Sequence, residues 1–250
     1  MNKLLLKALP ATALVLICCN ETSAQIDPWK YELGIHAGTF IYQGDLTPDK
    51  IGSYKTMKPV AGISVARLLT RSFSVKISLL RGNLHGNEAR YADPEWRRWR
   101  NFQFTNKITE VSAALVWDVL GNNHNSTSGK LSPYLAAGIG YSFMKVHRDW
   151  SALNSEYFSP ESALMTGLAV DTVTSPPKGL ISLPVSAGLK YRFSERLSIG
   201  VETTYRISST DYLDGFSYSG HPTEGDFYFS HTIGLYYNFI RRNRLNCPKF

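Results

Sequence analysis

Eight segments of this chain alternate apolar and polar residues with a period of two, and this pattern constrains the fold more than any other feature. Each segment places its apolar set on odd-numbered positions. Successive side chains of a β-strand point to opposite faces, so each segment predicts a strand with one apolar and one polar face. The segments lie near 30–43, 57–67, 72–83, 104–118, 132–143, 181–192, 197–207 and 227–239.

The composition supports a chain rich in strands. Of the 250 residues, 14 are Tyr, 12 are Phe and 19 are Gly, whereas only 19% are charged. Tyr and Phe are enriched in strands. A protein that crosses a bilayer repeatedly as helices is excluded, because each span needs about 20 mostly apolar residues. Only the first two dozen positions approach that requirement.

The connections between the segments alternate in length. Long connections cover about 44–56, 84–103, 144–179 and 208–225, and shorter ones cover 68–71, 119–131 and 194–196. Long external loops alternating with short periplasmic turns are typical of an up-and-down barrel in an outer membrane. A soluble lipocalin-like or sandwich domain is the alternative, and its interior would be apolar.

Charged side chains on the polar faces favour the membrane barrel. Such charges are costly to bury unless they pair with one another. The expected lumen network consists of Lys76, Glu110, Lys190, Glu202 and Arg206. The sequence therefore predicts an all-β fold, an eight-stranded antiparallel transmembrane β-barrel of the OmpA/OmpX-like type. Side chains fill a barrel of this size, so a pore is not expected.

The first 24 residues are typical of a secretory signal peptide. Lys3 and Lys7 precede an apolar stretch, and small residues up to Ala24 suit cleavage before Gln25. Cleavage removes two lysines and one glutamate, which lowers the formal net charge from +7 to +6. The expected organisation is a signal peptide at 1–24, an outer-membrane barrel at 25–239 and a basic periplasmic tail at 240–250.

The tail is expected to contact a periplasmic partner. The segment Thr232–Phe239 resembles the last-strand signal of bacterial outer-membrane barrels, yet the chain continues for eleven residues. Cys247 is the one cysteine left after cleavage, so it can form an intermolecular disulfide or remain a free thiol. The candidate partner-binding residues are Arg241, Arg242, Arg244 and Cys247.

Four blocks resemble the PorG family of outer-membrane barrels: Tyr42–Asp45, Arg100–Phe102, Ser132–Gly140 and Thr210–Asp214. The resemblance covers Tyr31–Phe239. It implies a non-enzymatic accessory of the type IX secretion apparatus that docks a periplasmic ring of PorK-like and PorN-like proteins. The last block departs from the family, because Gly215 follows Asp214 where a second acidic residue is expected, so a paralogue with another role remains open.

The expected working surface is periplasmic, formed by the 119–131 turn and the 240–250 tail. Two alternatives remain. An outer-membrane lipid-modifying enzyme, such as a lipid A deacylase, needs a nucleophile and base, for which only the surroundings of His221 and His231 offer candidates. A surface-binding or adhesin barrel would act through the 144–179 loop. The sequence shows no metal-ligand spacing and no phosphate-binding glycine loop, so no metal or cofactor is expected.

One loop segment combines basic and aromatic residues. An external position excludes nucleic acid as its ligand, and lipopolysaccharide phosphates are the expected alternative, with arginine on phosphate and tryptophan at the membrane interface. A solvated basic loop is the other interpretation. The candidate lipopolysaccharide contacts are Trp96, Arg97, Arg98, Trp99 and Arg100.

Overall fold

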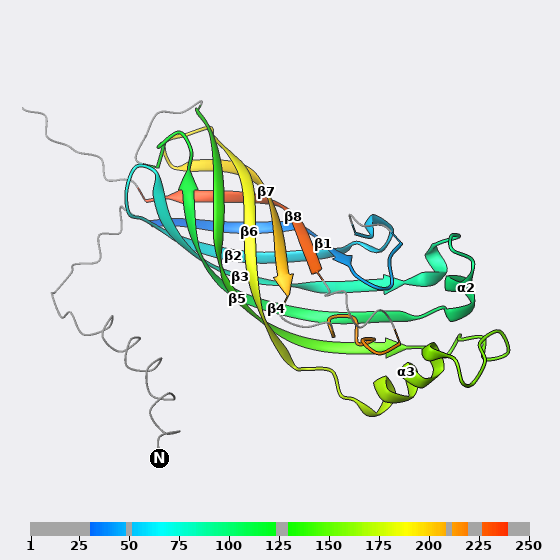
Figure 1. The fold of residues 1–250 in the computed structure, drawn as a ribbon. Coiled ribbons are helices and arrows are strands. Elements are labelled where there is room, and N and C mark those ends of the chain that lie inside the picture. Colours follow the sequence, from blue (N-terminus) through cyan, green and yellow to red (C-terminus); the bar gives the residue numbers. More distant parts are fainter. Residues whose placement is uncertain (1–30, 49–51, 124–129, 209–211, 220–226, 240–250) are drawn as a thin grey trace, which may run out of the picture.

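The computed structural model describes residues 31–48, 52–123, 130–208, 212–219 and 227–239. Within these residues eight antiparallel strands form a closed barrel, each strand pairing with its neighbour in sequence and β8 pairing with β1 (Figure 1). The strands are β1 (Tyr31–Gln43), β2 (Lys58–Leu68), β3 (Phe73–Asn87), β4 (Gln103–Asp118), β5 (Lys130–Asp149), β6 (Gly179–Arg192), β7 (Leu197–Ser208) and β8 (Phe227–Asn238). This confirms the expected fold class.

The two ends of the barrel differ. At the turn end β1 begins, β8 ends, and short connections join β2 to β3 and β6 to β7. At the loop end lie the longer connections and the short helices η2 (Tyr54–Thr56), η3 (Glu88–Arg90), α2 (Trp96–Arg100) and α3 (Ala163–Val173) (Figure 1). None of the helices in the described ranges has the length and apolar character needed to cross a membrane.

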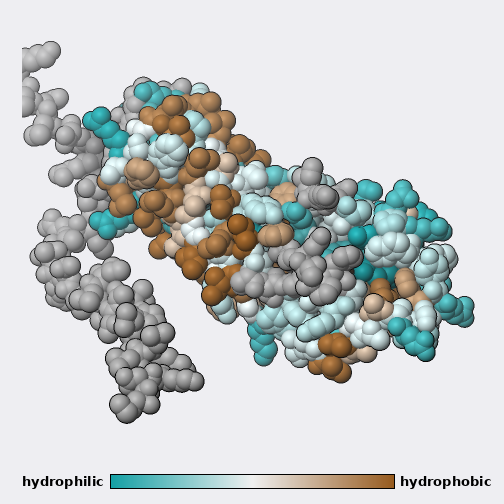
Figure 2. Space-filling view, viewed as in Figure 1, coloured by the Kyte–Doolittle hydropathy of each residue, from teal (hydrophilic) through white to brown (hydrophobic). Residues whose placement is uncertain are grey.

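The outer face carries the odd-numbered side chains. A belt of exposed apolar residues surrounds the barrel, including Ile35, Ile77, Ile139 and Val201. Trp117 and Tyr191 border the belt at the turn end, and Phe143 borders it at the loop end. An apolar band flanked by aromatic residues is the outer surface of a transmembrane barrel. Figure 2 shows this brown surface on the barrel wall and a paler, hydrophilic surface around α2, with a small brown patch at α3.

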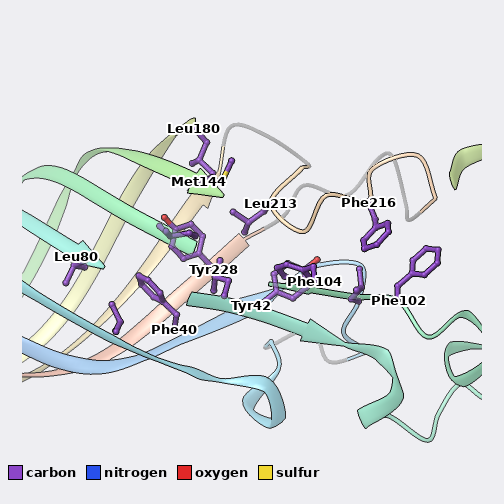
Figure 3. Packing of buried hydrophobic residues seen from close by; sticks show 14 of the residues in the cluster. Phe40, Tyr42, Leu80, Phe102, Phe104, Met144, Leu180, Leu213, Phe216 and Tyr228 are labelled. Carbon is purple, nitrogen blue, oxygen red and sulfur yellow. The ribbon is translucent and has the colours of Figure 1, made fainter. Parts of the chain in front are cut away.

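The inner face divides into two halves. The half toward the turn end contains ion pairs. The half toward the loop end contains an apolar core that includes Phe40, Leu84, Ile108, Met144 and Tyr228. Figure 3 shows that this core continues from the barrel into the loops through Leu213, Phe102 and Phe216. The sequence predicts a charged network in the lumen, whereas in the loop half the inward-facing side chains are apolar and pack against the loops.

Two strands extend further than the alternation predicted. β3 reaches Asn87 and β5 reaches Asp149, whereas the sequence pattern placed their ends near 83 and 143. Both extensions pair with β4, since Asn87 and Asp149 lie opposite Gln103 from its two sides. The loop between β5 and β6 is correspondingly shorter, from 150 to 178, and it contains α3.

Candidate functional site

Two ion pairs lie inside the barrel near the turn end. Lys76 Nζ on β3 lies 2.5 Å from Glu202 Oε2 on β7. The Tyr134 hydroxyl donates to the same carboxylate oxygen over 2.7 Å. Lys190 pairs with Glu32, and its ammonium group lies 4.3 Å from the centre of the Tyr236 ring. These contacts join six strands across the lumen, so the side chains fix the cross-section of the barrel.

A third ion pair lies deeper, at the boundary with the apolar core. Arg206 Nε donates to Glu110 Oε2 over 2.6 Å, and both side chains are only 1% exposed. The Tyr228 hydroxyl donates to the same oxygen over 2.8 Å, and Arg206 Nη1 donates to Ser230 Oγ over 3.0 Å. The guanidinium also lies over the ring of Phe40 at 5.3 Å. This cluster closes the lumen with paired charge.

The structure places every residue of the expected lumen network inside the barrel, and it pairs each of them. Lys76 pairs with Glu202, Arg206 with Glu110, and Lys190 with Glu32. Sequence reasoning missed the tyrosines that complete the network. The sequence contained a signal for them, because even-numbered positions of the strands face the lumen. Tyr134, Tyr228 and Tyr236 all occupy even-numbered positions.

The loops at the loop end fold into a packed cap, which comprises the described residues of 44–57, 88–102, 150–178 and 212–219. Glu88 is fully buried and accepts hydrogen bonds from Arg97 Nη1 at 3.1 Å, from Arg100 Nε at 2.8 Å and from the Phe102 backbone at 3.1 Å. Arg97 Nη1 also donates to the carbonyl of Asp45 over 2.9 Å. Burial lowers the pKa of the Arg97 guanidinium. The buried Glu88 carboxylate therefore binds α2 to η3, and Arg97 joins α2 to the loop between β1 and β2.

This arrangement corrects the expectation for 96–100. Arg97 and Arg100 point inward and neutralise Glu88, so they are not available to lipopolysaccharide phosphates. Trp96 lies against both guanidinium groups, at 4.9 and 4.8 Å from its ring centre. Arg98 and Trp99 remain exposed. Most of this segment is a structural part of the cap.

A second buried carboxylate fastens α3. Asp171 is 1% exposed, and its Oδ2 accepts hydrogen bonds from the backbone and the hydroxyl of Ser219 at 2.8 and 2.6 Å. Arg148 on β5 donates to the carbonyls of Asp171 and Gly215 over 2.6 and 3.0 Å. The helix is thereby fixed to the segment between β7 and β8.

Residues from three of the four blocks that resemble the PorG family meet in the cap. Tyr42 donates to Asp214 Oδ2 over 2.7 Å. Arg100 Nη2 donates to the Asp45 carbonyl over 3.4 Å, and the Phe102 ring stacks on Phe216, two residues beyond the last block, with the ring centres 4.5 Å apart. Gly215 has φ of +90°, a backbone conformation that suits glycine, and its position accounts for the absence of a second acidic residue after Asp214. These blocks therefore specify one structural unit.

The described part of the 119–131 turn is fixed to the neighbouring turn. The Asp118 carboxylate accepts hydrogen bonds from the backbones of Leu120 and Asn122, at 3.0 and 3.1 Å. The Asn123 backbone donates to the Arg71 carbonyl over 3.1 Å. Gly121 supplies the positive φ, of +65°, that the turn requires. Leu120 remains 60% exposed on this ordered surface.

His231 lies on the outer wall between two hydroxyl groups. Its Nδ1 is 2.9 Å from Thr203 Oγ1, and its Nε2 is 3.0 Å from the Tyr54 hydroxyl. No described acidic side chain contacts the imidazole, so a nucleophile, base and carboxylate are not assembled there.

The described residues hold no cluster of His, Cys, Asp or Glu suited to a metal ion. His221, the 240–250 tail with Arg241, Arg242, Arg244 and Cys247, and the signal segment lie outside the described residues.

Solved structures with a similar fold are outer-membrane barrels. Neisserial surface protein A is 12% identical, with a TM-score of 0.46, over 84% of this chain and 97% of that chain. Ail of Yersinia pestis, in complex with the heparin analogue sucrose octasulfate, is 14% identical, with a TM-score of 0.44, over 83% and 96%. The N-terminal barrel domain of Pseudomonas aeruginosa OprF is 14% identical, with a TM-score of 0.40, over 83% and 97%. At these identities the likeness concerns the fold alone.

Comparison of the sequence itself gives a family but no function. No curated protein matches the chain. A family model described as "Domain of unknown function (DUF6089)" matches residues 7–239, which include all eight strands. The chain therefore belongs to the DUF6089 family of unknown function.

Proposed function

We propose that this protein is a non-enzymatic accessory and anchor in the outer membrane, with its working surface in the periplasm. In this proposal the chain reaches the outer membrane after cleavage near Ala24. It belongs to a type IX protein secretion machine, where it docks a ring of PorK-like and PorN-like proteins. The assignment to the type IX machine rests on the resemblance to the PorG family. The structure of the turn end supports the docking role.

The ordered surface at the turn end is the observation that carries the proposal. Backbone hydrogen bonds connect Asn123 to Arg71 and Asp118 to Ser72, so the two neighbouring turns form one rigid unit. This unit presents Leu120, 60% exposed, and Leu69, 50% exposed. A preorganised surface with apolar side chains binds a partner without a large cost in conformational entropy. The basic tail at 240–250 follows β8, which ends at the same end.

The filled interior also supports an anchor. Three ion pairs and an apolar core occupy the lumen, so the barrel is a solid body whose surfaces are available for function. The family resemblance also fits the cap, because residues of the first block contact residues of the second and the last there, through Arg100 on the Asp45 carbonyl and Tyr42 on Asp214.

The test is affinity purification of the tagged protein from detergent-solubilised envelopes. Ring proteins are expected to copurify with the wild type, and Leu120→Asp is expected to reduce their recovery at least severalfold, because it places a charge in the apolar contact. The matched control is Val173→Asp, which makes the same kind of change on α3, where Val173 is 83% exposed at the opposite end. Equal recovery for both variants, or no ring protein with the wild type, contradicts the proposal.

A surface-binding role is the second candidate, and one feature of the cap favours it. Trp99 and Tyr157 stack with their ring centres 5.7 Å apart, although they are 39% and 54% exposed. The Asn154 backbone donates to the Trp99 carbonyl over 2.9 Å and fixes this pair. Rigid exposed aromatic rings provide contact area at low entropic cost. Loss of cell-surface adherence in a Trp99→Ala strain, with ring proteins still recovered, would favour this role.

A further inference from the structure

Three basic side chains lie on the outer face where β3, β4 and β5 leave the apolar belt. Arg81, Lys107 and Lys145 occupy outward, odd-numbered positions, and all three are exposed. Lys107 lies directly opposite Lys145 in the β4–β5 pair. Arg81 lies opposite Thr109, two positions from Lys107, so it is a diagonal neighbour of the lysine pair.

This arrangement leaves positive charge uncompensated. Like charges directly opposite on antiparallel strands destabilise the sheet. No acidic side chain in the described residues forms an ion pair with any of the three. The outward acidic residue of β5, Asp149, lies four positions further toward the cap and accepts hydrogen bonds from Ser151 at 2.9 and 2.7 Å. An external anion would relieve the repulsion.

An apolar hollow lies beside this charge, toward the turn end of the same wall. It measures about 470 Å³ and spans β3 to β6. The small outward side chain of Ala113 leaves space at its floor, and larger side chains form its walls. The lining includes Ile77, Val111, Ala113, Ile139, Tyr141 and Ile181.

The hollow and the basic residues are aligned along the same strands. Val111 and Tyr141 lie opposite each other at the hollow, and Lys107 and Lys145 lie four positions beyond them on β4 and β5. At about 3.3 Å per residue, four positions separate the two features by about 13 Å along the strands. A lipid whose headgroup carries phosphate spans such a distance between its phosphate and the upper part of its acyl chains.

We propose that this wall binds one phosphate-bearing lipid of the membrane leaflet at the loop end. Lys107, Lys145 and Arg81 bind the phosphate through charge-assisted hydrogen bonds, and one acyl chain occupies the hollow. The binding site is distinct from the 96–100 segment, where the inward arginines neutralise Glu88. It is independent of the periplasmic partner, so either proposal can fail while the other holds.

The first experiment removes the charge. Folded protein in detergent is titrated with lipid A that carries two phosphates, and bound lipid is counted by native mass spectrometry. Lys107→Gln with Lys145→Gln is expected to weaken binding about thirtyfold, because each basic residue at an anionic lipid surface contributes about a factor of five. The control, Arg67→Gln with Lys130→Gln, removes the same charge from exposed positions at the turn end. Equal affinities for the two double variants overturn the proposal.

The second experiment separates the lipid from its phosphate. Ala113→Leu fills the hollow from the outer face and is expected to weaken lipid A binding severalfold. Dephosphorylated lipid A is expected to bind to the wild type as weakly as lipid A binds to the Lys107/Lys145 double variant. Millimolar inorganic phosphate is expected not to displace lipid A. Displacement by phosphate, together with no effect of Ala113→Leu, would show a simple anion site and overturn the lipid assignment. Unboiled gel mobility confirms that each variant is folded.

Discussion

Removal of the Glu110 carboxylate tests the packed lumen most directly. Glu110→Gln keeps the shape of the side chain but leaves the Arg206 guanidinium, 1% exposed, without its counter-ion. Glu110 Oε2 accepts two hydrogen bonds, from Arg206 Nε at 2.6 Å and Tyr228 at 2.8 Å. Hydrogen bonds to a charged group contribute about 1.5–3 kcal/mol each, so loss of both would cost about 3–6 kcal/mol. This agrees with about 3–5 kcal/mol for breaking a buried ion pair.

The assay is urea unfolding of the barrel in lipid vesicles, followed by the mobility shift between folded and unfolded protein on unboiled gels. Glu195→Gln is the matched control, because Glu195 is exposed in the turn between β6 and β7. Its free energy of unfolding is expected to stay within about 0.5 kcal/mol of the wild type.

A second variant shows whether the cost comes from the unpaired charge. Glu110→Met with Arg206→Met removes both charges, and replacement of a buried pair by apolar residues is often neutral or stabilising. The double variant is therefore expected to be more stable than Glu110→Gln alone. If Glu110→Gln costs no more than Glu195→Gln, then Arg206 is solvated in the membrane-embedded protein and the reasoning is refuted.

Three further predictions follow from the barrel, the cap and the tail. Boiled and unboiled samples are expected to migrate differently on a gel, since a closed barrel keeps its backbone hydrogen bonds internal; co-migration would contradict the fold. Glu88→Gln is expected to loosen the cap, because it leaves Arg97 and Arg100 without a buried counter-ion, and limited proteolysis should then cut the loops at least tenfold faster, whereas Arg98→Ala should leave the rate unchanged. An intermolecular disulfide through Cys247 is expected to give a higher-mass band on non-reducing gels of alkylated envelopes, and a Cys247→Ser strain that keeps the band would exclude this residue.

The strands and their inner and outer faces could be predicted because the alternation has a simple physical cause. In the belt, outward positions contact apolar surroundings and inward positions contact a polar lumen. This rule placed Lys76, Glu110 and Glu202 inside. It could not choose their partners, because the partner of Lys76 lies 126 residues away on β7. Periodicity specifies a face, whereas strand order and register decide which side chains meet across the lumen.

The apolar interior of the loop half and the ends of β3 and β5 could not be predicted, because the alternation of apolar and polar residues reverses there. Beyond the belt the outward residues are polar, as Lys107 and Lys145 show, and the inward residues Leu84, Ile108 and Met144 are apolar. The strands continue through this change, so a search for apolar residues at odd positions ended β3 and β5 too early. The phase change itself marks where the wall leaves the belt.

The basic segment at 96–100 was misinterpreted for a different reason. Arginines beside tryptophans in a loop are consistent with a ligand-binding surface. Their counter-ion, Glu88, precedes Arg97 by nine residues and Arg100 by twelve. No helical or strand periodicity connects these positions, and only the folded loop brings them together.

The long-range contacts of the cap have a consequence for the order of folding. Tyr42 and Asp214 are 172 residues apart in the sequence. The hydrogen bond between them joins β1 to the loop that connects β7 to β8. Contacts of high sequence separation form late, because their loop-closure entropy must first be offset by other contacts. Pairing of β8 with β1 supplies these other contacts, and it brings Tyr42 close to the loop that contains Asp214. The loops of the cap therefore consolidate after β8 has paired with β1, and protection of the cap against protease reports completed assembly of the barrel.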